Sequence, residues 1–227
     1  MTIYNHIQAS IIGMHDCIQD AIKYFEDEDT IIAIVADGLG SKSLSSEGAK
    51  LICKLIVNEL KTKSTPLESD DIESPNLWYK HLEKKKCKID DYCTTCSFVF
   101  INKKIKKIYA GQIGDSPIFI CTDDKPVVEI RQQKVFSNIT DCLGGQTKNK
   151  FVVQHFSFTS SLKVLLASDG FGDELNGSSL NSLFNYLASK YQKYSHNTRS
   201  RLFKKEIENT VGKINNDDKS AIYIWSL

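Results

Sequence analysis

IIAIVADGLGS, residues 31–41, places six apolar residues directly before an Asp-Gly turn. Acidic residues precede the run at 27–29 and glycines follow it, which predicts a strand buried on both faces. Asp37 then lies at the edge of a core, where an unpaired carboxylate is costly and a cation is its natural partner. Gly38 and Gly40 allow a sharp turn, so a main-chain carbonyl could join Asp37 in binding a hard metal ion.

Two later segments resemble this arrangement. LLASDG (165–170) runs from an apolar strand into Asp169, and NDDKS (216–220) comes directly before a final apolar strand at 221–225. An Asp-Gly pair after a strand is by itself usually only a turn. Three such carboxylates at strand ends could nevertheless converge on one site, and Asp20 stands at a further strand end.

The remaining pattern predicts antiparallel strands with helices grouped between them, which is typical of an α+β layered domain. The short acidic link at 26–29 implies that the strands before and after it are antiparallel. Apolar residues at helical spacing mark the clearest helix at 49–60. We expect strands at 3–12, 21–25, 31–36, 94–101, 105–113, 118–121, 127–131, 151–158, 163–167 and 221–225, and helices at 49–60, 77–86, 179–191 and 198–211.

Composition argues against several classes of partner. The net charge is +1 with 25% charged residues, so no overall field favours nucleic acid or a membrane surface. The chain starts without a basic segment followed by an apolar one, and no apolar run approaches the roughly 20 residues of a spanning helix. We therefore expect a soluble, cytoplasmic protein that binds neither nucleic acid nor membrane.

The cysteines are not arranged as a disulfide framework. There are seven, an odd number scattered along the chain, which fits a reducing compartment. Cys93 and Cys96 form the one C-x-x-C, which could bind zinc or act in redox chemistry but lacks a second ligand pair. Residues three apart on a strand point to opposite faces, so we favour two ordinary core cysteines.

Taken together, the motifs resemble the metal-dependent protein serine/threonine phosphatases of type 2C, especially short bacterial-like members. The resemblance runs in order along nearly the whole chain through Gln19-Asp20-Ala21, Asp37-Gly38-Leu39-Gly40-Ser41, Thr94-Thr95, Gly114-Asp115-Ser116, Ala167-Ser168-Asp169-Gly170 and Asp217-Asp218-Lys219-Ser220. It implies one phosphatase-like domain over residues 1–227, an α+β fold with two central antiparallel β-sheets sandwiched between layers of helices.

The resemblance also implies an activity and a ligand set. The family hydrolyses phosphoserine and phosphothreonine in proteins with a hydroxide that bridges two Mn²⁺ or Mg²⁺ ions. In this sequence Asp37 would bridge both ions, the Gly38 carbonyl would bind one, and Asp169 and Asp217 would complete the shell of the first ion. Ser220 sets a register that favours Asp217 over Asp218. Oxygen ligands of this kind suit hard divalent cations.

Further roles follow from the same resemblance. Asp20 is the acidic member of the Gln19-Asp20 pair and counts among the catalytic residues. A third ion would need an aspartate just before Thr94-Thr95, where the register favours Asp90 over Asp91. The expected partners are phosphorylated proteins, and we expect a monomer.

Three positions depart from the family pattern. His15 stands where the family has a phosphate-holding arginine, Gln19 replaces a glutamate, and Leu39 replaces a histidine found in some relatives. His15 either holds the phosphate or protonates the leaving oxygen, and we include it among the catalytic candidates. Two hypotheses therefore stand: an active phosphatase, and a non-catalytic domain that binds a partner or a phosphorylated peptide. Metal-dependent turnover of a phosphoester separates them.

Overall fold

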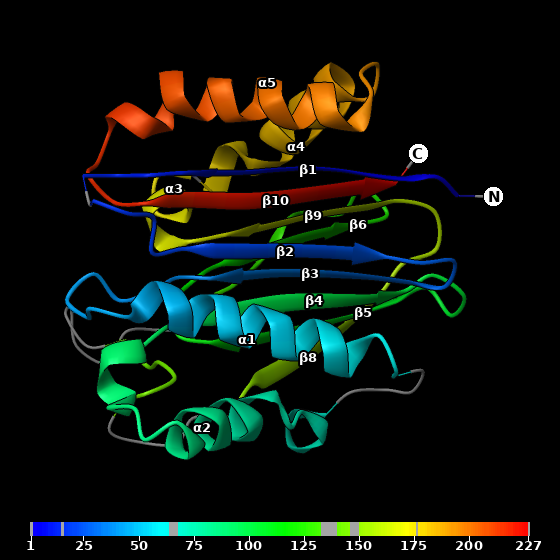
Figure 1. Cartoon of the computed structure of the whole chain (residues 1–227). Coiled ribbons are helices and arrows are strands. Elements are labelled where there is room, and N and C mark those ends of the chain that lie inside the picture. Colours follow the sequence, from blue (N-terminus) through cyan, green and yellow to red (C-terminus); the bar gives the residue numbers. More distant parts are fainter. Residues whose placement is uncertain are drawn as a thin grey trace.

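Two antiparallel sheets lie face to face, with helices covering the outer face of each (Figure 1). The structure is a computed structural model that describes residues 2–14, 16–63, 68–132, 140–145, 150–175 and 177–226. The arrangement confirms the α+β sandwich expected from the sequence.

The first sheet joins the two ends of the chain. Its strands lie in the order β1-β10-β9-β6-β7, and every neighbouring pair is antiparallel. Because the first strand pairs with the last, the segment that precedes β10 is brought next to the segment that follows β1. The bounds are β1 (Tyr4–Ile11), β6 (Ile118–Thr122), β7 (Val128–Ile130), β9 (Leu162–Ala167) and β10 (Lys219–Ser226).

The second sheet has the order β2-β3-β4-β5-β8 and is also antiparallel throughout. All seven residues of β3 are buried, since β3 lies between β2 and β4 with the first sheet on one face and a helix on the other. The antiparallel pairing of β2 with β3 agrees with the short link between them. The bounds are β2 (Ala21–Glu26), β3 (Thr30–Ala36), β4 (Cys96–Asn102), β5 (Lys107–Ile113) and β8 (Val152–Ser157).

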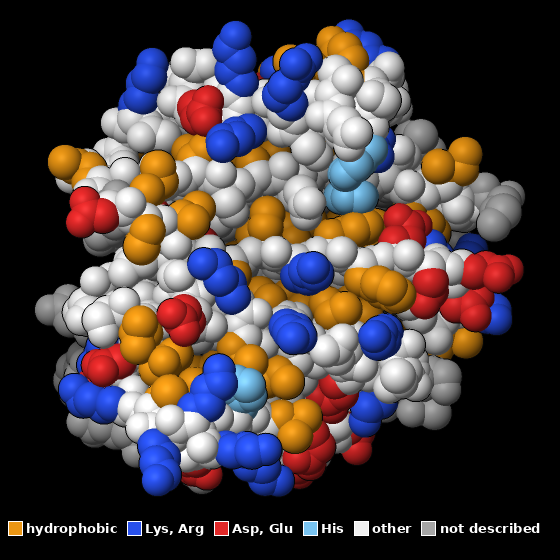
Figure 2. Space-filling model, viewed as in Figure 1, with side chains coloured by type: hydrophobic (Ala, Val, Ile, Leu, Met, Phe, Trp, Pro, Cys, Tyr) orange, Lys and Arg blue, Asp and Glu red, His pale blue; other side chains and the backbone are white. Residues whose placement is uncertain are grey.

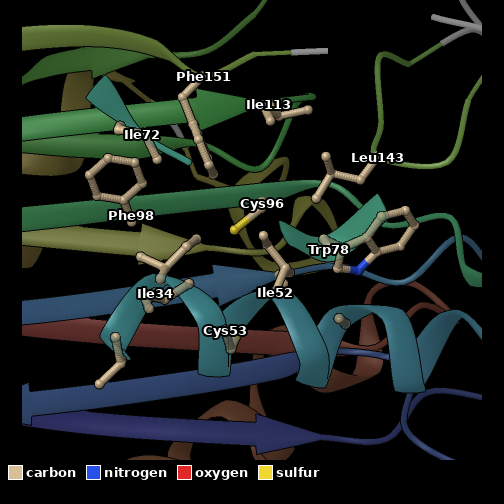
Figure 3. Close-up of a cluster of buried hydrophobic side chains, with 14 of the residues drawn as sticks. Ile34, Ile52, Cys53, Ile72, Trp78, Cys96, Phe98, Ile113, Leu143 and Phe151 are labelled. Carbon is tan, nitrogen blue, oxygen red and sulfur yellow. The ribbon is translucent and has the colours of Figure 1, made fainter. Parts of the chain in front are cut away.

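Three hydrophobic clusters hold these layers together. One lies between the two sheets. A second lies between the second sheet and helices α1 (Ser45–Leu60) and α2 (Ser74–Lys84), and it includes Ile52, Trp78 and Phe98 (Figure 3). The third lies between the first sheet and helices α4 (Leu180–Tyr191) and α5 (His196–Asn209). The short helix α3 (Asp169–Gly172) directly follows β9.

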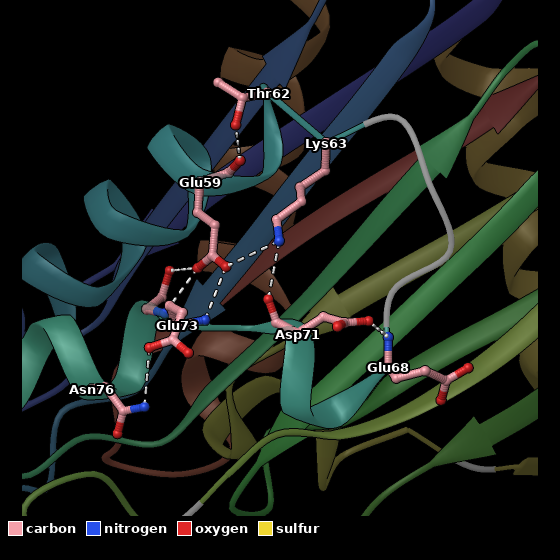
Figure 4. A network of polar contacts seen from close by, with 8 residues as sticks. Glu59, Thr62, Lys63, Glu68, Asp71, Glu73 and Asn76 are labelled. Carbon is pink, nitrogen blue, oxygen red and sulfur yellow. Dashed lines mark hydrogen bonds and ion pairs between the residues drawn. The ribbon is translucent and has the colours of Figure 1, made fainter.

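Helices α1 and α2 both begin earlier than their apolar spacing predicts. The first turn of α1 packs closely on the segment before β4, where a Cβ added to Gly48 would lie 2.0 Å from the Tyr92 carbonyl oxygen. The start of α2 is held by the Glu59 carboxylate of α1, which accepts hydrogen bonds from the backbone amides of Glu73 and Ser74 (Figure 4). Both beginnings are therefore fixed by tertiary contacts.

The outer surface carries charges of both signs. Figure 2 shows lysine and arginine side chains spread among hydrophobic and acidic ones on the face that α1 and α2 cover. Every helix in the described ranges is too short or too polar to cross a membrane.

Candidate functional site

A cavity of about 700 Å³ opens at the end of the molecule where β3 and β9 finish and β10 begins, beside α3 at the left of Figure 1. Three segments supply most of its wall: residues 37–40, 169–174 and 215–217. None of the lining residues that the structure describes is a lysine, arginine or histidine. Six lining residues are carboxylates: Asp37, Asp115, Asp169, Asp173, Glu174 and Asp217.

The turn after β3 is fixed by the Thr94-Thr95 pair. The Asp37 carbonyl accepts hydrogen bonds from the Thr95 amide at 2.8 Å and from the Thr94 hydroxyl at 2.9 Å. Gly38 follows in a narrow space, since an added Cβ would lie 2.7 Å from the Gln19 carbonyl oxygen. A side chain is excluded there, and the Gly38 backbone reaches the cavity wall.

The position of Asp169 is set by the tight turn that the chain makes between the end of β9 and the start of α3. The amide of Gly172 donates to the Ser168 carbonyl at 2.8 Å, which closes the turn of the short helix. Gly170 passes so close to the start of β10 that an added Cβ would lie 2.3 Å from the Asp218 carbonyl oxygen. The Asp169 carboxyl consequently faces the segment that carries Asp217.

Asp217 and Asp218 have different surroundings. Asp217 is exposed and lines the cavity. Asp218 is buried, and its two carboxylate oxygens accept the backbone amides of Gly13 at 2.7 Å and Gln19 at 2.6 Å. Asp218 therefore ties the start of β10 to the segment after β1. Asp217 Oδ1 accepts one hydrogen bond, from the Asp218 amide at 2.9 Å, so Asp217 keeps more capacity for a ligand than Asp218 does.

The clustered carboxyl groups raise one another's pKa values. Burial raises the pKa of Asp37 well above its usual value, and the charges of Asp20 and Asp169 add to the effect. The pKa of Asp169 is also raised, chiefly by burial. Without a cation, the site keeps protons that carboxylates ordinarily lose.

These residues fit a hard divalent cation chemically. Asp169 Oδ1 is buried and has no hydrogen-bond partner, and the Gly38 carbonyl accepts no hydrogen bond from any described residue. Both are oxygen donors, as such ions require. In the described part of the chain, however, no three His, Cys, Asp or Glu side chains stand ready around a single point. Ion binding would require the carboxyl groups to draw together.

Asp20 lies beneath the cavity without lining it. It is buried, and burial raises its pKa to about 7, with the charges of Asp218 and Asp169 adding to the effect. The hydroxyls of Ser220 and Ser168 act in the opposite direction, although neither reaches full hydrogen-bond geometry with the carboxyl group. Asp20 thus contributes charge near Asp37 from the inside.

The remaining residues of the sequence motifs are Asp90, Asp115 and His15. The structure does not bring Asp90 to the cavity wall, and its carboxylate pairs with Lys42 Nζ at 2.6 Å on the surface. Asp115 is buried in the cavity floor and accepts a hydrogen bond from the Thr140 hydroxyl at 2.9 Å. His15 lies outside the described residues.

The cysteines of the C-x-x-C have separate partners. Cys96 is in β4 and faces the core beneath α1 (Figure 3). Cys93 comes before β4, and its thiol is hydrogen-bonded to that of Cys142. Neither lines the cavity.

Several lining residues carry no motif that the sequence reasoning used. Asp173 and Glu174 follow Asp169 by four and five residues, so one helical turn brings them to the same wall. Asn215 is the residue that links the walls, because its side-chain amide donates to the Gly170 carbonyl at 3.0 Å and to Glu174 at 2.7 Å. Helical spacing could have indicated the acidic pair, whereas nothing local identifies Asn215.

Two helix-covered antiparallel sheets, with a cavity of carboxylates at one end of both, define an α+β sandwich with a site suited to hard cations. A family model described as protein phosphatase 2C matches residues 7–205, which is most of the chain. The chain belongs to that family.

Solved structures share this fold at low sequence identity. The catalytic domain of the serine threonine protein phosphatase PstP, in complex with 2 manganese ions, is 14% identical with a TM-score of 0.71, and the match covers 100% of both chains. RsbX in complex with magnesium is 16% identical with a TM-score of 0.65, over 99% of this chain and 96% of that one. The S. agalactiae serine/threonine phosphatase is 16% identical with a TM-score of 0.67, over 98% and 99%. A search of curated proteins finds no match.

Proposed function

We propose that this chain is a metal-dependent phosphatase that hydrolyses phosphoserine and phosphothreonine in protein substrates. The observation that carries the proposal is the convergence of Asp37, Asp169 and Asp217 on one cavity, from segments attached to both sheets. Membership of the protein phosphatase 2C family and the metal ions bound by PstP and RsbX support it.

The proposed roles are those that the family resemblance implies for these residues, and the oxygen donors on the cavity wall support them. Asp37 would lie between two Mn²⁺ or Mg²⁺ ions, with Gly38 offering its carbonyl and with Asp169 and Asp217 completing one shell. Such ions supply Lewis acidity and lower the pKa of water for in-line attack on phosphorus. Asp20 would stabilise the arrangement from below. Asp90 would serve a third ion only after leaving Lys42.

The charge of the cavity makes cations necessary for substrate binding as well. A phosphate dianion would meet six acidic side chains and no basic side chain among the described lining residues, and one of the six, Asp173, is paired with Arg131. Coulomb repulsion at such short range outweighs what neutral donors such as Thr95 supply. Divalent ions reverse the sign of this field, so both binding and turnover should require them.

No described lining residue is basic, and this also favours a second candidate, a non-catalytic domain that binds a partner or a phosphorylated peptide. Such a domain would bind metal or peptide with normal affinity but would show no turnover. The two candidates therefore differ in the amount of phosphate released, which is directly measurable.

The test is a titration of Mn²⁺ and Mg²⁺ against hydrolysis of p-nitrophenyl phosphate and of a phosphothreonine peptide. We expect activity to depend on the added ion and to fall by several orders of magnitude in Asp37→Asn and Asp169→Asn, which should stay folded. Asp70→Asn is the matched control, because Asp70 is an exposed aspartate whose partner is Lys150. Undiminished turnover in excess chelator would contradict the proposal.

His15 is the candidate to bind the substrate phosphate in place of the arginine that the family has at this position. Imidazole offers at most one well-aimed donor to the phosphate, and only the protonated ring is charged, whereas guanidinium is a permanent fork. If His15 holds phosphate, KM for the peptide should rise as pH passes the ordinary histidine pKa of about 6.5, and His15→Arg should lower KM.

If His15 instead protonates the leaving oxygen, His15→Arg should depress kcat on the phosphopeptide. It should spare p-nitrophenyl phosphate, whose leaving group needs little proton transfer. Unchanged KM and kcat in both His15→Arg and His15→Ala would remove His15 from the site.

A further inference from the structure

Lys219 is a buried lysine directly beside the cavity. It is the first residue of β10 and only 1% of its surface is exposed, although lysine is rarely buried without a charged partner. Among the described residues no carboxylate lies within ion-pair distance of its ammonium. The energetic cost of burying this charge must therefore be offset by other oxygens.

Three oxygens of the preceding segment offset it. The ammonium donates to the Asn215 carbonyl at 3.0 Å, to Asn215 Oδ1 at 2.7 Å and to the Asp217 carbonyl at 2.8 Å. An ammonium has three donors, so each of its N–H groups is used. Residues 215–217 consequently curl around the side chain that follows them in sequence.

The same segment is fastened to the opposite wall of the cavity. Asn215 Nδ2 donates to the Gly170 carbonyl and to Glu174, while Asn215 Oδ1 also accepts the Asp217 amide at 3.1 Å. A continuous chain of hydrogen bonds therefore runs from Lys219 through Asn215 to the segment that carries Asp169. Asp217 is held at two points of its backbone, and its carboxyl group remains on the cavity wall.

We propose that Lys219 is a positioning residue that fixes Asp217 relative to Asp169, so that the two carboxylates can share one divalent ion. This inference rests on the proposed function, because it assigns the ligand pair to a cation. The ammonium never touches the ion. It acts through Asn215 and through the Asp217 backbone.

Loss of the ammonium should loosen the segment. Methionine has a similar length but donates no hydrogen bond, so three buried oxygens would lose their donor and would have to move toward solvent. The positive charge also lies close to a cavity of carboxylates, and its removal would raise their mutual repulsion. Residues that orient metal ligands typically change metal affinity by about 10- to 100-fold when replaced.

The experiment is calorimetric titration of the full chain with Mn²⁺ alone. We expect Lys219→Met to weaken Mn²⁺ binding by about 10- to 100-fold and Lys219→Arg to recover part of the loss. With p-nitrophenyl phosphate, the Mn²⁺ concentration for half-maximal rate should rise more than kcat falls. Lys163→Met is the control, since the ammonium of Lys163 in β9 also has polar partners, but these partners, Asp124 and Asn185, do not line the cavity.

A purely structural role would give a different result, a lower melting temperature of the metal-free protein with wild-type Mn²⁺ affinity. That result in Lys219→Met would overturn the inference. If Lys219→Met does not fold, Asn215→Ala breaks the same chain at a less buried residue and should weaken Mn²⁺ binding about 10-fold. Wild-type affinity in Asn215→Ala would then overturn it. Absence of Mn²⁺ binding to the wild-type protein would overturn the proposed function, and this inference with it.

Discussion

At the scale of single residues, burial divides neighbouring groups of the same chemistry into different roles. Both carboxylate oxygens of Asp218 accept hydrogen bonds from the backbone amides of Gly13 and Gln19, whereas Asp217, one residue earlier, lines the cavity. From the sequence, only the register of the family motif favours Asp217 over Asp218 as the metal ligand. The structure adds an independent reason for the same preference, since a carboxylate with two backbone donors has little capacity left for an ion.

His6 shows the same effect of environment on a titratable group. Its ring stacks on Tyr24 of β2, with centroids 3.5 Å apart, and lies near His196 and Arg199 of α5. Burial lowers the pKa of His6 to about 3, and the charges of His196 and Arg199 contribute. The folded protein therefore keeps His6 neutral at pH values where an unfolded chain would protonate it.

We predict that His6 makes the fold sensitive to mild acid. As pH falls, His6 takes up a proton in the unfolded state near pH 6.5 but in the folded state only near pH 3. The free energy of unfolding therefore carries no penalty from His6 above pH 6.5 and decreases as pH falls from about 6.5 toward 3. The loss should be less than about 1.4 kcal/mol per pH unit, because solvent reaches part of the ring. Urea unfolding of wild type and of His6→Phe, at pH 7 and pH 5, measures it.

His6→Phe retains the stacking on Tyr24 but cannot titrate. The difference between the two proteins isolates His6, since other groups such as Asp20 titrate in both. Replacement of the exposed His81 by Phe is the control for a change of composition alone. An unaltered pH dependence in His6→Phe would show that the ring titrates normally.

At the scale of elements, hydrophobic periodicity predicts that a helix or strand exists and which of the two it is, whereas tertiary contacts determine the residues at which it begins and ends. Every strand expected from the sequence is present, and the clear apolar face of α1 lies on the second sheet as its spacing requires. The short helix α3 was not predicted, because four residues containing two glycines carry no helical pattern. Strand β10 begins at Lys219, two residues before the predicted start at Ala221. The prediction starts late because a lysine does not continue an apolar run in the sequence, even when it is buried in the structure.

The junction between α1 and α2 offers a direct test of such a contact. The Glu59 side chain accepts two backbone amides at the start of α2 and the Ser74 hydroxyl (Figure 4). We predict that Glu59→Ala lowers the free energy of unfolding by about 1.5–3 kcal/mol, the range for hydrogen bonds to a charged group. Glu59→Gln should lose less, because it keeps the acceptor oxygen.

Urea denaturation measures both variants. Glu73→Gln is the control, because the Glu73 side chain lies on the surface and accepts a hydrogen bond from the exposed Asn76. Equal stability of Glu59→Ala and wild type would mean that solvent satisfies the start of α2 as well as Glu59 does.

At the scale of the whole molecule, the candidate site depends on how the two sheets stack. Asp37 extends from the second sheet, while Asp169 and Asp217 adjoin β9 and β10 of the first. The sequence predicted that these three could converge, because each stands at a strand end. It could not predict that Asp90 pairs with Lys42 away from the cavity or that Asn215 and Lys219 fasten the wall, since these contacts depend on loop conformations and on side-chain burial.

A cation in this cavity would connect the two sheets, and we therefore predict that Mn²⁺ stabilises the whole fold. Binding to the folded state alone adds about 2.7 kcal/mol when the free ion exceeds its dissociation constant 100-fold. The melting temperature should rise steadily with Mn²⁺ concentration and return to its starting value on addition of chelator. Thermal unfolding followed by circular dichroism across a Mn²⁺ series measures this.

Asp37→Asn is the decisive comparison for that prediction. A carboxyl group whose folded pKa is raised well above its usual value opposes folding at pH 7, so its removal should leave the metal-free protein at least as stable as wild type. The same variant should lose most of the stabilisation by Mn²⁺, because it lacks the carboxylate that we propose as a metal ligand. A structural role for the Asp-Gly turn predicts the reverse, a lower melting temperature without metal and no response of either protein to Mn²⁺. If Asp37 binds metal, Asp37→Asn should therefore keep its stability without metal and lose most of the shift caused by Mn²⁺. If Asp37 has only a structural role, the variant should lose stability without metal, and Mn²⁺ should shift neither protein.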